Sequence, residues 1–352
     1  MALDSVGCSG DAKGRQVYPS VDAQIARSFT ASGSGYWDMK SNDHGDVLVH
    51  RATVAKEICR AHNISRLPMA DLVQVLQRPS SYKGMDGRYI TWLINDDRAR
   101  FLYCVVPKTG STNLRRILAE LKQRPQNVTR AFNWTRMAAK ESWFYRFDFL
   151  SSRSADQISE ILNRPNYTKI LTVRHPIERI ISLYRMLFEG DHFENKTVNF
   201  LQSVTDGMVQ MIRGRLKMPN LTSENVTFTH LVRYIIDHDQ CIKQARCRTN
   251  WYEAQWSPVW RMCRVCSVDY DIVIRLETYD MDLPYLLHRA NFSSTLHYPD
   301  YYKRTSKDLT DRYLRQLTKE QIDGLYEVYK MDYKLFGYSH TRPDVFKDKW
   351  QE

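Results

Sequence analysis

The sequence predicts a single α/β domain with a mainly parallel central sheet flanked by helices, and three observations support this. An apolar strand pattern over 101–106 runs into a short loop and then into a helical pattern. The same order recurs where the β-rich segment 168–173 is followed by an amphipathic helix. The length of 352 residues, with 43% hydrophobic and 12% aromatic residues, suffices for one substantial core.

The remaining elements are predicted in order along the chain. Residues 1–46 are rich in Gly, Ser and Asp without sustained periodicity, so we expect a flexible lead-in before a domain over 47–345. Helical spacing follows in 47–63 and in 68–78, and the segment 88–106 predicts two strands around a turn. The segment 189–230 has no sustained apolar pattern and is interpreted as an inserted loop region.

The C-terminal part predicts one strand and one helix. The apolar run within 269–277 predicts a strand ending at Arg275 and Glu277, which either touch a ligand or form an ion pair that supports the fold. Thr318 and Gln321 have the spacing of a capping box at a helix start. Aromatic residues then recur at helical spacing and predict core packing: Tyr326, Tyr329, Tyr333 and Phe336.

The charge of the chain indicates an acidic partner. Lys and Arg outnumber Asp and Glu by 51 to 40, a net charge of +11, which fits a nucleic acid, a nucleotide, a polyanionic sugar or a membrane surface. Nucleic acid is disfavoured because no groove-reading or RNA-binding motif is present. The cluster Arg213, Arg215 and Lys217 fits an acidic glycan and an ordinary charged loop almost equally well.

Glycosylation sequons favour the secretory pathway. Eight of the fourteen asparagines begin an Asn-x-Ser/Thr sequon, whereas chance predicts about one in eight. The eight are Asn63, Asn127, Asn133, Asn166, Asn195, Asn220, Asn225 and Asn291. No apolar run reaches the length of a membrane helix, and the first thirty residues lack the apolar core of a signal peptide, so we expect that an anchor is missing from this chain.

The seven cysteines fit an oxidising compartment. Their odd number leaves at least one unpaired, and Cys104, inside an apolar strand pattern, is the predicted free thiol. Cys263 and Cys266 could form half of a zinc site, but no second pair stands at zinc-finger spacing. We therefore expect disulfides and no metal.

The loop after the first core strand predicts an anion-binding site. The run Pro107-Lys108-Thr109-Gly110-Ser111-Thr112 brings a Lys, three hydroxyl groups and a helix N-terminus together. It differs from a Walker A loop because the Lys precedes the Gly. The alternative is a turn with a hydroxyl helix cap and an exposed Lys.

The second strand-to-helix junction supports this interpretation. Arg174 follows a predicted strand directly, Pro176 suits a first helical turn, and Ser182 lies two turns further on. In open α/β sheets, ligands bind at the carboxyl ends of the strands, where both junctions fall.

These two segments carry a resemblance to a known family. PKTGSTNLRRIL and TVRHPIERIISLYR resemble the 5′-phosphosulfate loop and the 3′-phosphate motif of sulfotransferases that use 3′-phosphoadenosine 5′-phosphosulfate. WSPVWRMCRVCSVDYDIVIRLET and LTKEQIDGLYEVYKMDYKLFGYS resemble Golgi carbohydrate sulfotransferases of the chondroitin and dermatan 4-O and glucuronyl 3-O type. Matching blocks lie between Arg88 and Ser339. The resemblance implies the P-loop-like sulfotransferase fold.

The resemblance also implies roles for individual residues. Lys108, with Thr109, Gly110, Ser111, Thr112 and Asn113, would bind the sulfate-bearing 5′ end, and Arg174 and Ser182 would bind the 3′-phosphate. No metal would be required. Related enzymes carry a His between the two motifs, where this chain has none, and often a His where it has Gln255. Candidates for the general base are Glu141, His175 and His192. Lys303 and Arg304 are either ligand contacts or surface residues.

The predicted function is therefore sulfuryl transfer to a hydroxyl of an acidic glycan or glycosaminoglycan in the Golgi lumen. The resemblance points first to the 4-O position of N-acetylgalactosamine in chondroitin or dermatan, as in proteoglycan synthesis. Two alternatives stay open. PKTGST also resembles uronyl 2-O-sulfotransferases, and a protein that has lost its base would be an inactive glycan-binding homologue. The loop region 189–230 would flank the acceptor cleft.

Overall fold

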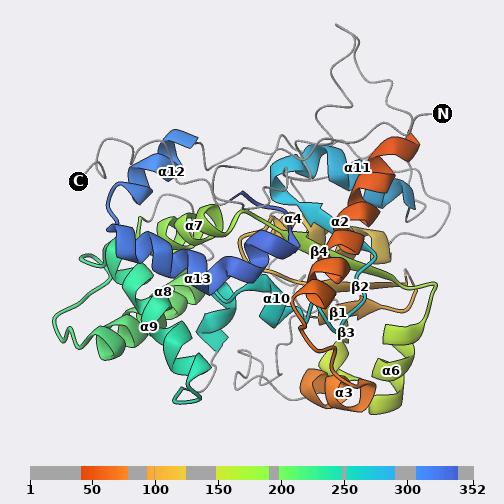
Figure 1. The fold of residues 1–352 in the computed structure, drawn as a ribbon, viewed down its shortest axis with the longest axis horizontal. Coiled ribbons are helices and arrows are strands. Elements are labelled where there is room, and N and C mark those ends of the chain that lie inside the picture. Colours follow the sequence, from red (N-terminus) through yellow and green to blue (C-terminus); the bar gives the residue numbers. More distant parts are fainter. Residues whose placement is uncertain are drawn as a thin grey trace, which may run out of the picture.

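The computed structural model describes residues 41–77, 93–98, 100–123, 148–189, 198–247, 251–289 and 307–339. Within these residues, helices surround a five-stranded sheet (Figure 1). The strands are β1 (Leu93–Asp96), β2 (Phe101–Cys104), β3 (Asp148–Phe149), β4 (Thr168–Val173) and β5 (Ile272–Arg275). The α-helices are α2 (Ser41–Ala61), α3 (Met69–Gln77), α4 (Ser111–Gln123), α6 (Ala155–Asn163), α7 (Pro176–Phe188), α8 (Val198–Leu216), α9 (Phe228–Lys243), α10 (Val259–Met262), α11 (Tyr279–Arg289), α12 (Lys307–Leu314) and α13 (Lys319–Leu335). The short 3₁₀ helices are η2 (Leu150–Ser152), η3 (Trp251–Gln255) and η4 (Leu276–Thr278).

The sheet is parallel at its centre and antiparallel on one side. Its strand order is β3-β1-β2-β4-β5. β4 pairs in parallel with both β2 and β5, whereas β1 pairs antiparallel with β2 and β3. The predicted α/β class is confirmed, and two of the three parallel strands, β2 and β4, end at the two predicted loops. The predicted helices in 47–63 and 68–78 are present as α2 and α3, although α2 begins before Val47.

Alternating side chains along each strand build a separate apolar layer on each face of the sheet. In β2, Phe101 and Tyr103 are buried in a cluster with residues of α4 and α11. Leu102 and Cys104 are buried on the opposite face, in a cluster with residues of α2, α3, α6 and α10. Figure 1 shows α2 running across this sheet. Both loops at the ends of β2 and β4 therefore leave a fully packed sheet.

A third apolar cluster joins helices α7, α8, α9, α12 and α13 beside the sheet (Figure 1). The predicted capping box at the start of α13 is confirmed, because the Gln321 N–H donates to the Thr318 hydroxyl and the Thr318 N–H donates to the Gln321 side chain. The aromatic stripe on α13 is core as predicted, with Tyr329 fully buried and Tyr333 and Phe336 nearly so.

The segment expected to be an inserted loop contains α8, a helix of 19 residues. Val204, Met208 and Ile212 of this helix are buried in the third cluster. Sequence periodicity missed the helix because Gly207 and Gly214 and several polar residues interrupt the apolar stripe. The region therefore contributes to the core.

Three disulfides lie within the described residues, and two of them link segments far apart in the sequence, with separations of 207 and 159, whereas the third closes a separation of 6. They join Cys59 to Cys266, Cys104 to Cys263, and Cys241 to Cys247. The prediction that Cys104 is a free thiol is wrong. An odd number of cysteines leaves one unpaired but does not say which one. Cys104 is buried in β2 next to Cys263, at the end of α10, and forms a disulfide with it. Cys263 and Cys266 belong to separate disulfides, so they are not a zinc pair. Cys8 lies outside the described residues.

Candidate functional site

The loop between β2 and α4 turns sharply and presents the start of a helix. Lys108 and Gly110 both have left-handed backbone conformations, with φ of 69° and 77°. A Cβ on Gly110 would lie 2.6 Å from the Leu276 Cδ1, so a side chain does not fit there. α4 then begins at Ser111 and has no acidic residue in its first turn. The backbone N–H groups of such a turn form an uncompensated site for an anion.

Thr109 fastens this loop to the sheet. Its hydroxyl donates to the Val106 carbonyl at 2.8 Å and lies 2.8 Å from the Thr172 hydroxyl in β4. The Tyr103 hydroxyl lies 2.9 Å from the same Thr172 oxygen. Thr109 is fully buried, and Ser111 is nearly so. In this structure the Thr109 side chain thus shapes the loop from behind, whereas Thr112 is exposed at the start of α4.

One face of α7 continues the site from the second junction. Arg174 lies two residues before α7, and Glu178 and Ser182, four residues apart, share one face at the start of the helix. The Arg174 guanidinium donates to the Lys108 carbonyl at 3.3 Å and to Glu178 at 3.4 Å. The next position of this face is Met186, whose sulfur lies 3.1 Å from the Lys108 Nζ. Both predicted basic residues therefore lie along the same helix face.

A buried arginine supports the loop from below. Arg179 is 1% exposed and donates to the Pro107 carbonyl at 3.1 Å. The same guanidinium donates to the carbonyls of Ser257, Ala254 and Gln255 at 2.6, 3.2 and 3.4 Å. Burial lowers the pKa of Arg179 from its usual value. It remains a cation at neutral pH because an arginine pKa lies far above 7, so a positive charge lies beneath the anion-binding loop.

The Glu277 carboxylate holds together the segments next to the start of α7. Glu277, just after β5, accepts from the His175 backbone N–H at 2.7 Å and from the Tyr338 hydroxyl at 3.0 Å. Arg275 lies 4.5 Å from the centre of the Tyr338 ring and donates to the Phe336 carbonyl. Glu277 thus ties the start of α7 to the segment after α13. Arg275 and Glu277 could either touch a ligand or support the fold, and these contacts favour support of the fold.

The sequence matches a known family over this whole region. A profile of the sulfotransferase family matches residues 92–339, which include both loops, α7 and α13. The chain belongs to the sulfotransferase family. This family implies 3′-phosphoadenosine 5′-phosphosulfate as the sulfate donor.

Several relatives of this sulfotransferase-family chain are named for carbohydrates. It is 30% identical to carbohydrate sulfotransferase 11 of Rattus norvegicus over 257 residues, which covers 70% of this chain and 67% of the rat protein. It is 28% identical to carbohydrate sulfotransferase 14 of Danio rerio, covering 70% of this chain and 61% of the relative. For carbohydrate sulfotransferase 8 of Homo sapiens, the identity is 27%, covering 76% and 60%. The chain thus spans roughly two thirds or less of each relative's length, and no solved structure matches it.

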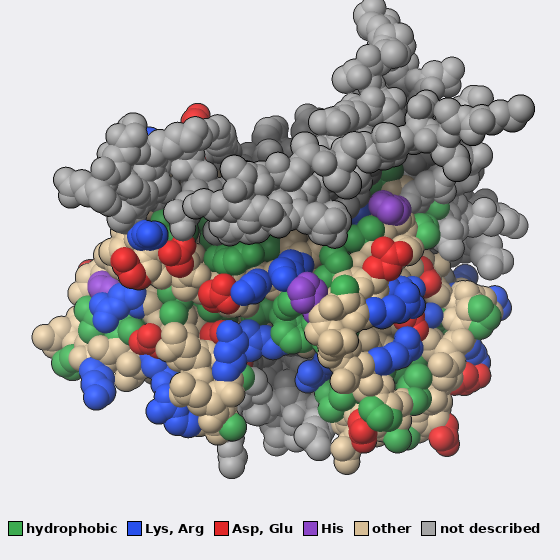
Figure 2. All heavy atoms as spheres, in the orientation of Figure 1, with side chains coloured by type: hydrophobic (Ala, Val, Ile, Leu, Met, Phe, Trp, Pro, Cys, Tyr) green, Lys and Arg blue, Asp and Glu red, His purple; other side chains and the backbone are tan. Residues whose placement is uncertain are grey.

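The described residues fit such a donor. Lys108 and the N-terminus of α4 offer donors for the sulfate-bearing end, and Arg174 and Ser182 lie along the adjoining face of α7. Gly110 permits the left-handed turn, with φ of 77°, that leads from Lys108 into α4. Figure 2 shows Lys and Arg side chains along the middle of one face of this sulfotransferase. The positive charges of Lys108, Arg174 and Arg179 around the loop suit a nucleotide with several negative charges.

The other predicted site residues either make contacts other than the one between Arg174 and the Lys108 loop or lie outside the described residues. His175 precedes α7, and its ring lies edge-on to Tyr333 and Tyr338, with centroids 5.4 and 5.5 Å away. Arg213 donates to the Leu221 carbonyl, and Arg215 lies against His238 and Cys247, so both support the fold around α8. Several predicted residues lie outside the described residues of this sulfotransferase: Glu141, His192, Lys303 and Arg304.

Sequence reasoning missed the supports beneath the site. Arg179 carried one signal, because a basic residue in the first turn of a helix opposes the helix dipole. Asp332 accepts from the backbone N–H groups of Val259 and Trp260 at 2.7 and 2.9 Å, and this pairing has no sequence pattern.

In the part of the chain that the structure describes, no group of three or more His, Cys, Asp or Glu side chains is placed to hold a metal ion. None of the helices within the described ranges has both the length and the apolar character needed to span a membrane.

Proposed function

We propose that the protein transfers a sulfuryl group from 3′-phosphoadenosine 5′-phosphosulfate to a hydroxyl group of a glycan. One observation carries the proposal: the Lys108 loop and the α7 face meet through the bond from Arg174 to the Lys108 carbonyl, at 3.3 Å. This contact places the cationic loop proposed for a phosphosulfate next to the arginine proposed for a terminal phosphate. The carbohydrate acceptor is supported by the names of the relatives.

The chemistry needs little beyond charge and position. The acceptor oxygen attacks the sulfur in line, the bond from sulfur to the bridging phosphate oxygen breaks, and adenosine 3′,5′-bisphosphate leaves. Negative charge grows on the leaving phosphate, where Lys108 and the N–H groups at the start of α4 provide donors already in place. Arg174 offers a planar fork for the 3′-phosphate.

The acceptor hydroxyl also has to lose a proton. Among the described residues, we propose His175 for this role because it adjoins Arg174 and is only partly buried. Tyr333 and Tyr338 hold its ring in one orientation. Glu141 and His192, outside the described residues, stay as the other proposed bases.

The proposed acceptor is the 4-O position of N-acetylgalactosamine in chondroitin or dermatan, and the proposed compartment is the Golgi lumen. The four sequon asparagines that the structure describes are all exposed, as glycosylation requires: Asn63, Asn166, Asn220 and Asn225. The disulfides also suit an oxidising lumen. We expect the protein produced in cultured animal cells to lose mass when it is treated with an N-glycosidase, and such a loss would support this location.

The deciding experiment is titration calorimetry with adenosine 3′,5′-bisphosphate, compared with adenosine 5′-monophosphate. Binding that depends on the 3′-phosphate supports the donor site, and no binding by folded protein overturns it. A panel of unsulfated chondroitin, desulfated dermatan and desulfated heparan then tests the acceptor. Preferred transfer to a uronic acid would favour the 2-O alternative, and glycan binding without turnover would favour an inactive homologue.

A further inference from the structure

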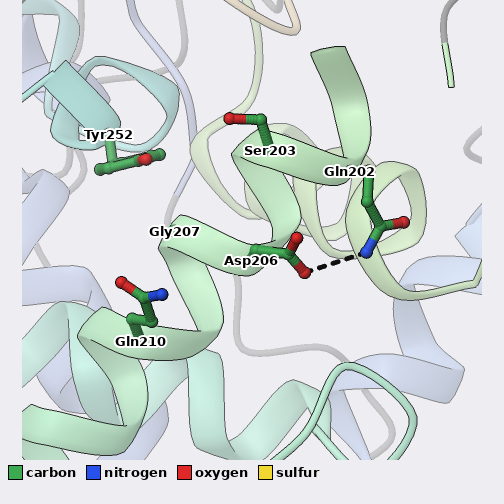
Figure 3. A pocket seen from close by; sticks show the side chains of 6 residues that line it. All are labelled: Gln202, Ser203, Asp206, Gly207, Gln210 and Tyr252. Carbon is green, nitrogen blue, oxygen red and sulfur yellow. Dashed lines mark hydrogen bonds between the residues drawn. The ribbon is translucent and has the colours of Figure 1, made fainter. Parts of the chain in front are cut away.

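A pocket lies between α8 and η3, apart from the nucleotide site described above (Figure 3). Its volume is about 430 Å³, within the range of small-ligand sites. The lining residues are Gln202, Ser203, Asp206, Gly207, Gln210 and Tyr252. The four polar side chains on α8 are exposed, so they are accessible to a ligand from solvent.

The aromatic ring of this pocket sits on a glycine. A Cβ on Gly207 would lie 2.1 Å from the Tyr252 ring, so only glycine permits the ring to lie on this helix. Ser203 and Gln210 share this helix face with Gly207, because they lie four residues before it and three after it. In Figure 3 both side chains extend toward the side on which Tyr252 lies. Gln202 instead donates to Asp206 at 2.9 Å (Figure 3).

The chemistry of this lining suits a sugar. A pyranose ring carries a rim of hydroxyl groups and a face of C–H groups. Amide, hydroxyl and carboxylate groups can bind the rim, and an aromatic ring can pack on the face. The lining contains one carboxylate and no cation. A sugar without sulfate or carboxylate therefore fits better than a uronic acid.

The pocket shares its support with the anion-binding loop. Tyr252 belongs to η3, and the carbonyls of Ala254 and Gln255 in the same short helix accept from Arg179. Arg179 also donates to the Pro107 carbonyl, next to Lys108. One buried side chain thus fixes the pocket segment and the donor loop to each other.

We infer that this pocket is an acceptor subsite that binds an uncharged hexosamine ring of the glycan. The inference rests on the proposed function, because the glycan is its proposed acceptor. The ring would lie against Tyr252, with its hydroxyl and amide groups bonded to Ser203 and Gln210. Recognition of an uncharged ring here would leave the charged sugars of the chain to other surfaces.

The test compares two glycine variants in the same helix. Gly207→Ala would push the Tyr252 ring out of place, whereas Gly214→Ala meets nothing within 4 Å and is the matched control. The probe is an unsulfated chondroitin hexasaccharide, whose binding to protein saturated with adenosine 3′,5′-bisphosphate is followed by NMR. We expect Gly207→Ala to weaken hexasaccharide binding about tenfold, on the order of one or two lost hydrogen bonds. Gly214→Ala should match wild type, and neither variant should change nucleotide affinity.

A double variant, Ser203→Ala with Gln210→Ala, removes only exposed side chains and guards against misfolding of the glycine variant. Wild-type hexasaccharide binding by this double variant and by Gly207→Ala overturns the subsite. So does a nucleotide-binding wild type that does not bind the hexasaccharide. If the proposed function itself is wrong, the wild type will not bind adenosine 3′,5′-bisphosphate, and this result distinguishes that failure from failure of the subsite alone.

Discussion

The guanidinium of Arg174 donates to the main-chain carbonyl of Lys108 at 3.3 Å. The bond joins the residue after β4 to the loop after β2, and these two strands are parallel neighbours. It therefore fixes the distance between the groups proposed for the two ends of the nucleotide.

Replacing Lys108 by alanine should strongly slow transfer and leave the fold intact. The side chain is partly exposed on the loop, and its charge is proposed to meet the leaving phosphate. We expect kcat to fall by about a hundredfold to a thousandfold, as for loss of one donor to developing charge. Lys319→Ala, on the exposed start of α13, is the control. Wild-type turnover in Lys108→Ala would refute the loop assignment.

Replacing Arg174 by alanine should weaken binding of adenosine 3′,5′-bisphosphate far more than binding of adenosine 5′-monophosphate. A charged hydrogen bond to the 3′-phosphate is worth about 1.5–3 kcal/mol, or roughly ten- to a hundredfold in affinity. Arg185→Ala, on α7 and paired with Glu189, is the control. Calorimetry that shows equal weakening for both nucleotides would count against the assignment.

Replacing His175 by glutamine should lower kcat by about a hundredfold or more without changing the affinity for adenosine 3′,5′-bisphosphate. The imidazole is proposed to take the acceptor proton, whereas Arg174, its neighbour in the sequence, is proposed to bind the nucleotide. His62→Gln, at an exposed position, is the control. An unchanged kcat in His175→Gln would show that His175 is not the general base and would leave Glu141 and His192 as the candidates.

Stability should depend on pH through Asp332. Burial raises the pKa of this carboxyl from 3.8 to about 6 in the folded protein. Between these values the folded state holds a proton that the unfolded state has released, so the contribution of Asp332 to stability falls as pH rises from about 4 to about 6. Asp332→Asn should be less stable overall but should lack this slope. Urea unfolding at several pH values measures the difference, with Glu327→Gln on the same helix as control. Parallel pH profiles for wild type and Asp332→Asn would contradict the raised pKa.

Removal of the disulfide between Cys104 and Cys263 should destabilise the domain more than removal of the one between Cys241 and Cys247. The first closes a sequence separation of 159 and the second a separation of 6. Loop-closure entropy predicts losses of about 4 and about 2 kcal/mol, allowing for the neighbouring disulfide from Cys59. Paired Cys→Ser variants, unfolded in urea, measure both. Equal losses would show that chain entropy does not dominate.

Local sequence signals predicted the elements that carry the site. The apolar strand before Pro107, the glycine at 110 and Pro176 at a helix start depend on backbone preferences of the residues themselves. They placed Lys108 and Arg174 on neighbouring loops, as the structure confirms. The helix α8 was missed because glycines that serve a contact, such as Gly207 beneath Tyr252, look like helix breakers in the sequence alone.

The sequence by itself determined the α/β class, the family and the two loops, because periodicity and loop chemistry are local properties. Only the tertiary structure decided that Cys104 pairs with Cys263, that Arg179 supports the loop, and that Glu277 binds Tyr338. These contacts join residues between 61 and 159 positions apart. Such pairings depend on how the elements pack, and one chain's sequence contains no local signal for them.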